Sequence, residues 1–128
     1  MFDQPEVMGM ASALAANASA RLTAIAQNVA NADTPGYSAR DVQSFQDSYR
    51  AASDHPLRTT RPGHIGGFSG QQLTALSERS GGHMSPNGNN VSLENEMLTA
   101  AGVRKDHDLA LTIYRTSLGL LRTSLGRR

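Results

Sequence analysis

The fold of this chain is restricted above all by two heptad-like stripes, one towards each end of the sequence. Over residues 93–125, ten positions follow alternating steps of four and three residues, and eight of them are uncharged and suited to packing. From Val7 to Val29, apolar or small side chains recur at nearly the same spacing. Such spacing is typical of helices that pack in coiled-coil fashion. We therefore predict two long helices, over about residues 6–32 and 91–125.

The predicted helices do not offer enough apolar surface for a large core of their own. Only 38% of the residues are hydrophobic and 5% are aromatic, and much of the apolar content is alanine, which buries little surface. The second helix also carries apolar side chains off its stripe, as a helix surrounded by others does. We expect copies or partners to complete the packing, with a monomeric helical hairpin as the alternative. The residues expected to pack are Leu14, Leu22, Ile25, Val29, Leu93, Met97, Leu111, Tyr114, Leu118, Leu121 and Leu125.

A second stripe on the first helix is polar but made of short side chains. It consists of Asn17, Arg21, Ala24, Asn28 and Asn31, and it would allow another helix to approach closely. Asn28 and Asn31 lie one turn apart on one face. If they are buried against another protomer, their amides would set the register of packing at a cost in stability. The alternative is that both amides face water.

The segment between the stripes is rich in residues that interrupt regular structure. Residues 33–88 hold eight of the 12 glycines and four of the 5 prolines. Such composition favours turns and loops, although helical spacing of Val42, Phe45 and Tyr49 predicts one short helix over residues 41–52. A long irregular stretch is unusual inside a compact domain, and it fits a segment that orders on assembly.

The predicted fold class is therefore mainly α. An N-terminal assembly helix (residues 1–32) and a C-terminal assembly helix (91–128) would pair as an antiparallel, coiled-coil-like hairpin. The irregular middle segment (33–90) would join them within one structural domain. Glu94 and Glu96 complement the positive end of the second helix. Since one pair of helices cannot bury every stripe, we also predict higher-order packing.

Composition argues against several classes of function. The net charge is +1 and the basic residues are scattered, unlike the clustered basic surface of a nucleic-acid-binding protein. The chain has no cysteine, and its four histidines form no pair at metal-ligand spacing. No acid–base pair or phosphate-binding loop stands out. We predict that the protein is not an enzyme, with no catalytic residues, no metal and no cofactor.

The sequence also bears on the route of the chain in the cell. No segment is long and apolar enough to suggest a membrane span. Residues 7–20 form a run of small residues, but acidic residues precede it, whereas a cleaved secretory signal begins with basic ones. We expect any route out of the cytoplasm to leave such a segment uncleaved.

The clearest local signature is "NVANADTPGYSARD", residues 28–41. Thr34 precedes Pro35 and is therefore pushed out of the helical region, while Pro35 itself cannot continue a helical hydrogen-bond ladder. Pro35 and Gly36 suit the centre of a type II turn in which glycine has a positive φ. We predict that the first helix ends near Ala32 and that the chain then turns sharply.

These residues resemble the N-terminal signature of the flagellar rod, hook and hook-associated axial proteins, a helix that ends in a pattern like A-N-x-x-T-P-G-Y. The combination of "NADTPGY" with "ARDV" is most similar to the short proximal rod proteins of the bacterial flagellar basal body. "RTTRPGHI" and "GNNVSLENEM" resemble further segments of that family. Ser38 and Ser92 depart from it, where basic and acidic residues are common. The motif and assembly residues are Asn28, Asn31, Thr34, Pro35, Gly36 and Tyr37.

The resemblance implies a structural subunit of the rod, the shaft that transmits torque across the periplasm. Such a chain is exported unfolded by the flagellar type III export apparatus, without signal cleavage. Its terminal helices pack with those of other subunits into a helical tube around the axial export channel. The implied partners are copies of itself, other flagellar rod proteins and the rod–export-gate adaptor protein. The alternatives are another short axial rod subunit that shares the motif, or a coiled-coil adaptor or export chaperone.

Overall fold

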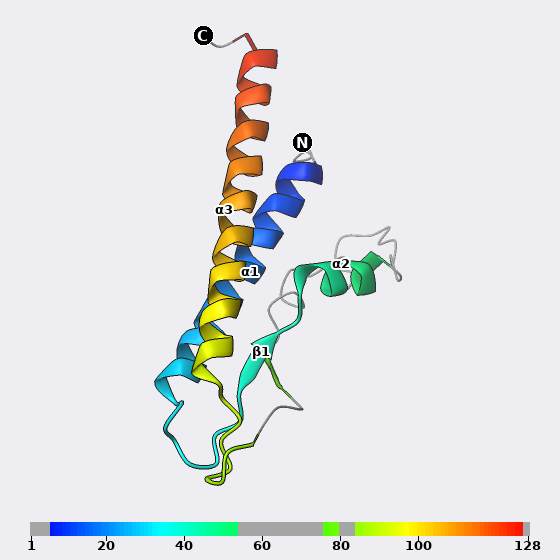
Figure 1. The fold of residues 1–128 in the computed structure, drawn as a ribbon. Coiled ribbons are helices and arrows are strands. Elements are labelled where there is room, and N and C mark those ends of the chain that lie inside the picture. Colours follow the sequence, from blue (N-terminus) through cyan, green and yellow to red (C-terminus); the bar gives the residue numbers. More distant parts are fainter. Residues whose placement is uncertain (1–5, 54–75, 80–83, 127–128) are drawn as a thin grey trace.

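The computed structural model describes residues 6–53, 76–79 and 84–126. Two long helices dominate it: α1 (Glu6–Ala30) and α3 (Leu93–Ser124). They lie side by side and run in opposite directions, so the end of α1 and the start of α3 meet at one end of the molecule (Figure 1). The chain is mainly helical, as predicted. Both helices begin and end within two residues of the predicted bounds.

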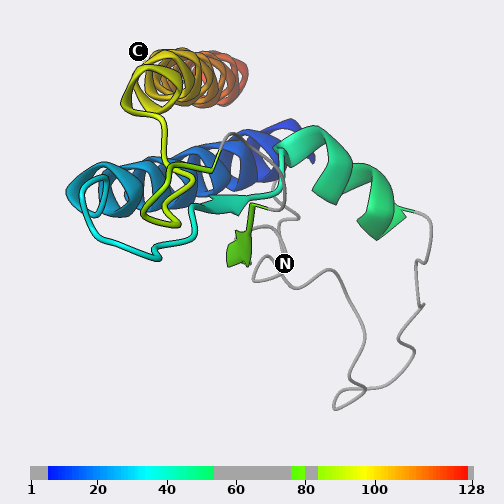
Figure 2. The same cartoon turned by 60° about the horizontal axis from the view of Figure 1, so that its bottom comes forward.

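The middle segment contains regular structure that the sequence analysis assigned to loops. Strand β1 (Arg40–Val42) pairs with β2 (Leu76–Glu78) in an antiparallel sheet, with Arg40 facing Glu78 and Val42 facing Leu76. Figure 2 shows α1 lying between α3 and these two short strands. Pairs of three-residue strands carry too little periodicity to be recognised from sequence. The other expected loops of residues 54–75 and 80–83 lie outside the described residues.

The short helix predicted over residues 41–52 is present but begins later. Helix α2 spans Phe45–Ser53, and residues 40–42 form β1 instead. The start is set by Ser44, whose Oγ accepts a hydrogen bond from the backbone N–H of Asp47 (3.3 Å). Ser44 Oγ also donates to the Asp47 carboxylate (2.6 Å), in the manner of a helix N-cap. The Phe45 and Tyr49 rings then lie one turn apart, tilted by 31° to each other, with centroids 5.6 Å apart.

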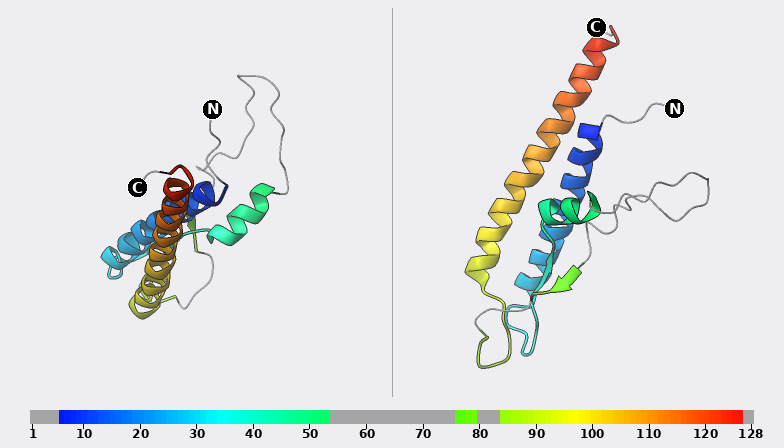
Figure 3. Two further views of the ribbon diagram at one scale, coloured as in Figure 1. Left: turned by 90° about the horizontal axis from the view of Figure 1, so that it is seen from above. Right: turned by 90° about the vertical axis from the view of Figure 1, so that its right-hand side faces the viewer.

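The buried apolar core is thin. Its centre is formed by Ala18 and Ile25 of α1 with Val103 of α3, and Leu22 and Ala100 pack against it. Several large apolar side chains of α3 remain exposed, including Leu98 at 74% and Leu120 at 66%. Helix α3 also extends beyond the start of α1 (Figure 3). The single chain therefore leaves much of its apolar helix surface open.

Candidate functional site

The family-like motif forms a tight turn directly after α1. The backbone N–H of Tyr37 donates to the carbonyl of Thr34 (3.3 Å), and Gly36 has a φ of +71°. This agrees with the predicted type II turn, because that turn needs a positive φ at its third residue. Helix α1 ends at Ala30, two residues before the predicted end. Thr34, Pro35 and Gly36 are exposed, so the turn is presented at the surface.

A second proline- and glycine-containing turn packs against the first. Residues 85–88 close through a hydrogen bond from Gly88 N–H to the Ser85 carbonyl (2.8 Å), and Gly88 has a φ of +79°. Gly36 N–H donates to the carbonyl of Asn87 (3.0 Å), which joins the two turns directly. A Cβ on Gly88 would lie 3.5 Å from Gly36 Cα. We call these two turns, residues 34–37 and 85–88, the tip; they lie at the lower end of Figure 1.

Asn89 fastens the end of α1 to the tip. Its side chain is buried, and Nδ2 lies within hydrogen-bond distance of the carbonyls of Asn31 (2.9 Å), Ala32 (2.8 Å) and Thr34 (2.9 Å). Its Oδ1 accepts a hydrogen bond from Val91 N–H (2.8 Å). Carbonyls at the end of a helix have no partner within the helix. One amide from the segment before α3 therefore satisfies carbonyls that the end of α1 leaves open.

Asn28 is the centre of the site. Its side chain is fully buried, and its Oδ1 accepts hydrogen bonds from Arg40 N–H (2.9 Å) and from the Tyr37 hydroxyl (3.2 Å). Its Nδ2 donates to the Arg40 carbonyl (2.8 Å) and to Glu96 Oε2 (3.1 Å). The amide thus pairs with both backbone groups of Arg40 and uses all its hydrogen-bonding capacity. Neither expectation for Asn28 holds, since it is buried within its own chain, facing neither another protomer nor water.

Asn31 has a more local role. It is half-buried, and its Nδ2 donates to the carbonyl of Gln27 (2.8 Å) in the last turn of α1. Its Oδ1 accepts a hydrogen bond from the Thr34 hydroxyl (3.3 Å). The structure thus brings together two pairs of motif residues, Asn28 with Tyr37 and Asn31 with Thr34.

A chain of alternating charges runs beside Asn28. Glu96 is fully buried, and its Oε1 accepts a 2.6 Å hydrogen bond from Arg79 Nη1. Arg79 Nη2 donates to Asp41 Oδ2 (3.2 Å), and Asp41 Oδ1 lies 3.7 Å from Arg21 Nε. Burial lowers the pKa of Arg79, but hydrogen bonds and charges from Glu96 and Asp41 outweigh it and raise the pKa above its ordinary value. The guanidinium therefore stays charged.

The polar stripe of α1 is covered by the chain itself, not by another helix as expected. Asn17 Nδ2 donates to the carbonyl of Gln43 (3.0 Å), Arg21 approaches Asp41 and Asn28 pairs with Arg40. The extended segment after the tip thus runs back along α1. It buries Ala39 and Val42 between these polar contacts. A strand can lie here because asparagine side chains satisfy the backbone groups that a sheet partner would otherwise satisfy.

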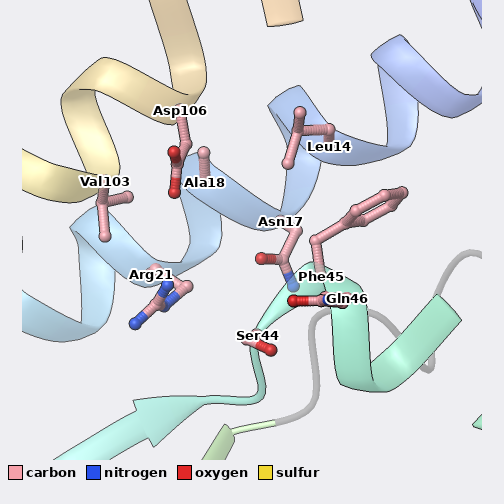
Figure 4. A pocket seen from close by; sticks show the side chains of 9 residues that line it. All are labelled: Leu14, Asn17, Ala18, Arg21, Ser44, Phe45, Gln46, Val103 and Asp106. Atoms are coloured by element: carbon pink, nitrogen blue, oxygen red, sulfur yellow. The ribbon is translucent and has the colours of Figure 1, made fainter. Parts of the chain in front are cut away.

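A cavity of about 230 Å3 lies where α1, α3 and the start of α2 meet (Figure 4). Leu14 and Phe45 face it from two elements, and Val103 and Asp106 face it from α3. Close packing is therefore interrupted where α2 leaves the helix pair. Within the ranges given above, no cluster of three or more acidic or histidine side chains is placed to bind a metal ion. Across the same described residues, no helix has the length and apolarity to cross a membrane.

The residues expected to pack fall into two groups in the single chain. Ile25 is buried, and Leu14, Leu22, Leu111, Tyr114 and Leu118 are partly buried. The others are exposed: Val29 at 39%, Leu93 at 50%, Met97 at 65%, Leu121 at 36% and Leu125 at 80%. Their role in assembly stays a prediction, because it depends on surfaces that a single chain does not cover.

Sequence reasoning missed the residues that complete the site. Arg79, Asn89 and Asn90 come from the middle segment, and Glu96 was assigned to the helix dipole alone. Asn90 joins the residue before β1 to the residue after β2, since its Oδ1 accepts a hydrogen bond from Ala39 N–H (2.6 Å) and its Nδ2 donates to the Arg79 carbonyl (3.3 Å). The available signal was the pair of asparagines directly after a proline–glycine turn, since asparagine side chains commonly satisfy turn backbone.

Two comparisons with known proteins cover this region. The sequence model of a family described as "Flagella basal body rod protein" matches residues 10–37, which span most of α1 and the turn after it. The "Flagellar basal body rod protein FlgB" of Agrobacterium fabrum is 28% identical over 115 residues, covering 87% of this chain and 86% of that protein. Together these matches confirm the resemblance of this chain to the flagellar basal-body rod proteins, and to FlgB in particular.

Proposed function

We propose that this protein is a structural subunit of the proximal rod of the bacterial flagellar basal body. In that role it transmits torque and helps to line the axial export channel. The observation that carries the proposal is the exposed apolar surface of α3 in a chain similar to FlgB over most of its length. Apolar surface of this extent favours burial against neighbouring subunits. The site at the tip is then a structural device and not a catalytic centre.

In this proposal the terminal helices pack with those of other subunits into a helical tube. The coiled-coil-like pairing of α1 with α3 is the unit that assembles, and the middle segment supplies contacts to neighbours. The partners are copies of this chain, other rod proteins and the rod–export-gate adaptor protein. A helical tube needs contacts between unlike surfaces of adjacent copies. The open stripe of α3 offers one such surface, since α1 covers only part of it.

The test is deletion of the gene in the source bacterium, with complementation by the intact gene. Loss of swimming and of basal bodies with a complete rod is the expected result. The same strain, complemented by a tagged copy, is used to purify basal bodies and to detect the chain in them. Normal swimming of the deletion strain, or a chain that stays in the cytoplasm bound to a secreted client, would contradict the proposal.

Export is tested separately. We expect the chain to leave the cytoplasm through the flagellar type III apparatus, with its N-terminal segment uncleaved, and to reside in the periplasmic rod. The intact mass of the chain from purified basal bodies should then equal the mass encoded by the gene. Loss of an N-terminal segment would show that another export route is used.

A further inference from the structure

Glu96 is a buried carboxylate placed where the two long helices meet. It lies in the first turn of α3, and its Oε2 accepts a hydrogen bond from Asn28 Nδ2 of α1 (3.1 Å). Neither Asn28 nor any other amide can neutralise its charge. A buried charge is tolerated when an opposite charge and hydrogen bonds replace the lost water. The positive charge comes from Arg79, whose Nη1 lies 2.6 Å from Oε1.

Arg79 belongs to neither helix. It directly follows β2, and its backbone N–H donates to the Ala39 carbonyl (2.8 Å), which extends the β1–β2 pairing by one residue. Its Nη2 reaches Asp41 on β1 (3.2 Å). The position of the guanidinium therefore depends on the docking of β2 against β1. Among the described residues, the positive charge that pairs with Glu96 therefore depends on that strand pairing.

We propose that Arg79 is a conformational latch. It couples docking of β2 against β1 to the contact between the end of α1 and the start of α3, where Asn28 meets Glu96. With β2 docked, Arg79 neutralises Glu96, and Glu96 can stay buried against Asn28. With β2 undocked, Glu96 is a buried carboxylate without a counter-charge, so water must enter and the helices separate at this end. The hydrogen bond between Asn28 and Glu96 forms in one alignment of α1 along α3, and the latch stabilises that alignment. This inference does not rest on the rod function.

Engineered cysteines give a direct measure of the latch, because the natural chain contains no cysteine. Arg40 and Glu78 are opposite each other in the β1–β2 pair, and both side chains are exposed. Facing residues of an antiparallel pair lie within the span of a disulfide. The variant Arg40→Cys with Glu78→Cys should therefore form an intramolecular disulfide at a rate that reports how often β2 is docked. The rate is measured in the purified chain and in cells that produce it.

Substitutions at the latch are then added to this cysteine pair. Arg79→Met should slow disulfide formation by roughly ten-fold or more, because it leaves Glu96 buried and unpaired. Adding Glu96→Gln should restore much of the rate, since a neutral amide needs no counter-charge. Arg79→Lys should give an intermediate rate, because one ammonium cannot reach both carboxylates as the guanidinium fork does. Arg104→Met, on the exposed surface of α3, is the matched control and should leave the rate unchanged.

Two results would overturn the latch. One is a disulfide rate in the Arg79→Met variant equal to that of the parent cysteine pair. The other is a double variant, Arg79→Met with Glu96→Gln, that is as slow as Arg79→Met alone. In the second case Arg79 would matter only through its own packing, with no coupling to the charge of Glu96. Circular dichroism of the Arg79→Met variant separates a latch from a general loss of folding, since a latch predicts that α1 and α3 keep their helicity while the disulfide forms slowly.

Discussion

At the scale of single residues, this protein concentrates its polar interactions on a few asparagines. Asn28 makes the backbone hydrogen bonds to Arg40 that a neighbouring strand would otherwise make, and Asn89 donates to carbonyls at the end of α1. Both side chains are buried and bonded through N–H donors as well as oxygen acceptors. An aspartate has the same shape but no donor at physiological pH. The amide, and not merely a small polar residue, is therefore what each position requires.

Asn28→Asp should strongly destabilise the folded chain. The change removes the hydrogen bonds to the Arg40 carbonyl and to Glu96, and it places a second carboxylate beside Glu96. We expect a loss of about 3 kcal/mol in the free energy of unfolding, measured by urea denaturation. Asn95→Asp is the matched control, because Asn95 is exposed in the first turn of α3, where a negative charge is favourable. Equal stability of the Asn28 and Asn95 variants would contradict the role assigned to Asn28.

At the scale of elements, glycine has different effects in the turns of the tip and in the long helices. Gly36 adopts a positive φ that the turn requires, and its N–H is bonded to Asn87. Gly102 lies within α3 on an exposed position, and a Cβ there would meet nothing within 4 Å. Glycine is thus needed in the turn, whereas in the helix it only adds flexibility to the unfolded chain.

Alanine substitutions should therefore change stability in opposite directions at these two glycines. Gly36→Ala should lower the free energy of unfolding by about 1 kcal/mol, the cost of a side chain in the left-handed region. Gly102→Ala should raise it by roughly 0.5–1 kcal/mol, since alanine favours helix. Thermal unfolding of the two variants, followed by circular dichroism, tests this contrast. A stabilised Gly36→Ala variant would show that the turn does not need its positive φ.

Helix α3 carries a row of apolar side chains that α1 does not cover. Leu98, Leu109 and Leu120 are each more than half exposed. Steps of eleven residues are close to three full helical turns, so these leucines share one face. A face of this kind is suited to packing against another helix.

Leu98→Ala combined with Leu120→Ala should separate folding from assembly. Helicity of the purified chain should be preserved, because both side chains are exposed and alanine is a good helix former. Swimming of a strain that carries only this variant should be reduced, because the face formed by Leu98, Leu109 and Leu120 can no longer pack against neighbouring subunits. Ile25→Ala is the comparison variant: Ile25 is buried, so its truncation should cost about 2–4 kcal/mol of folding stability. Normal motility of the double leucine variant would argue against assembly through this face.

At the scale of the whole molecule, a thin core is combined with a well-bonded tip. The apolar contacts between α1 and α3 centre on Ala18, Ile25 and Val103, which bury little surface for helices of this length. Charges and amides next to the tip add hydrogen bonds at one end of the molecule, whereas the opposite end of α3 extends past α1. The α1–α3 pair is therefore held most firmly near the tip. The opposite end of α3 depends for its stability on what packs against it.

Helicity should consequently depend on concentration. As a dilute monomer the chain should show less helicity than it does at high concentration, because its exposed stripes lack partners and long helices gain most of their stability from packing. Raising the concentration, or adding a rod partner, should increase helicity by mass action. Circular dichroism over a hundred-fold range of concentration checks this. Helicity that stays constant over this range would contradict it.

Much of the fold could be predicted from local pattern, and the site only in part. The heptad stripes predicted α1 and α3, and Pro35 with Gly36 predicted the turn, because each depends on neighbouring residues. The β1–β2 pairing was missed because three-residue strands have almost no periodicity. The start of α2 was misplaced because the Ser44 cap was overlooked. Arg79, Asn89 and Glu96 were missed as site residues because their partners are distant in sequence.

By itself, then, the sequence determined the two long helices, the turn after α1 and the similarity to flagellar rod proteins. These follow from spacing and backbone restrictions that act over a few residues. Only the tertiary structure decided where Asn28 points: into its own chain, between Arg40 and Glu96. It also decided that β1 covers the polar stripe of α1 and that Arg79 supplies the counter-charge of Glu96. The physical reason is that a buried amide or carboxylate is defined by the groups that satisfy it, and here these lie as many as 68 residues away along the chain.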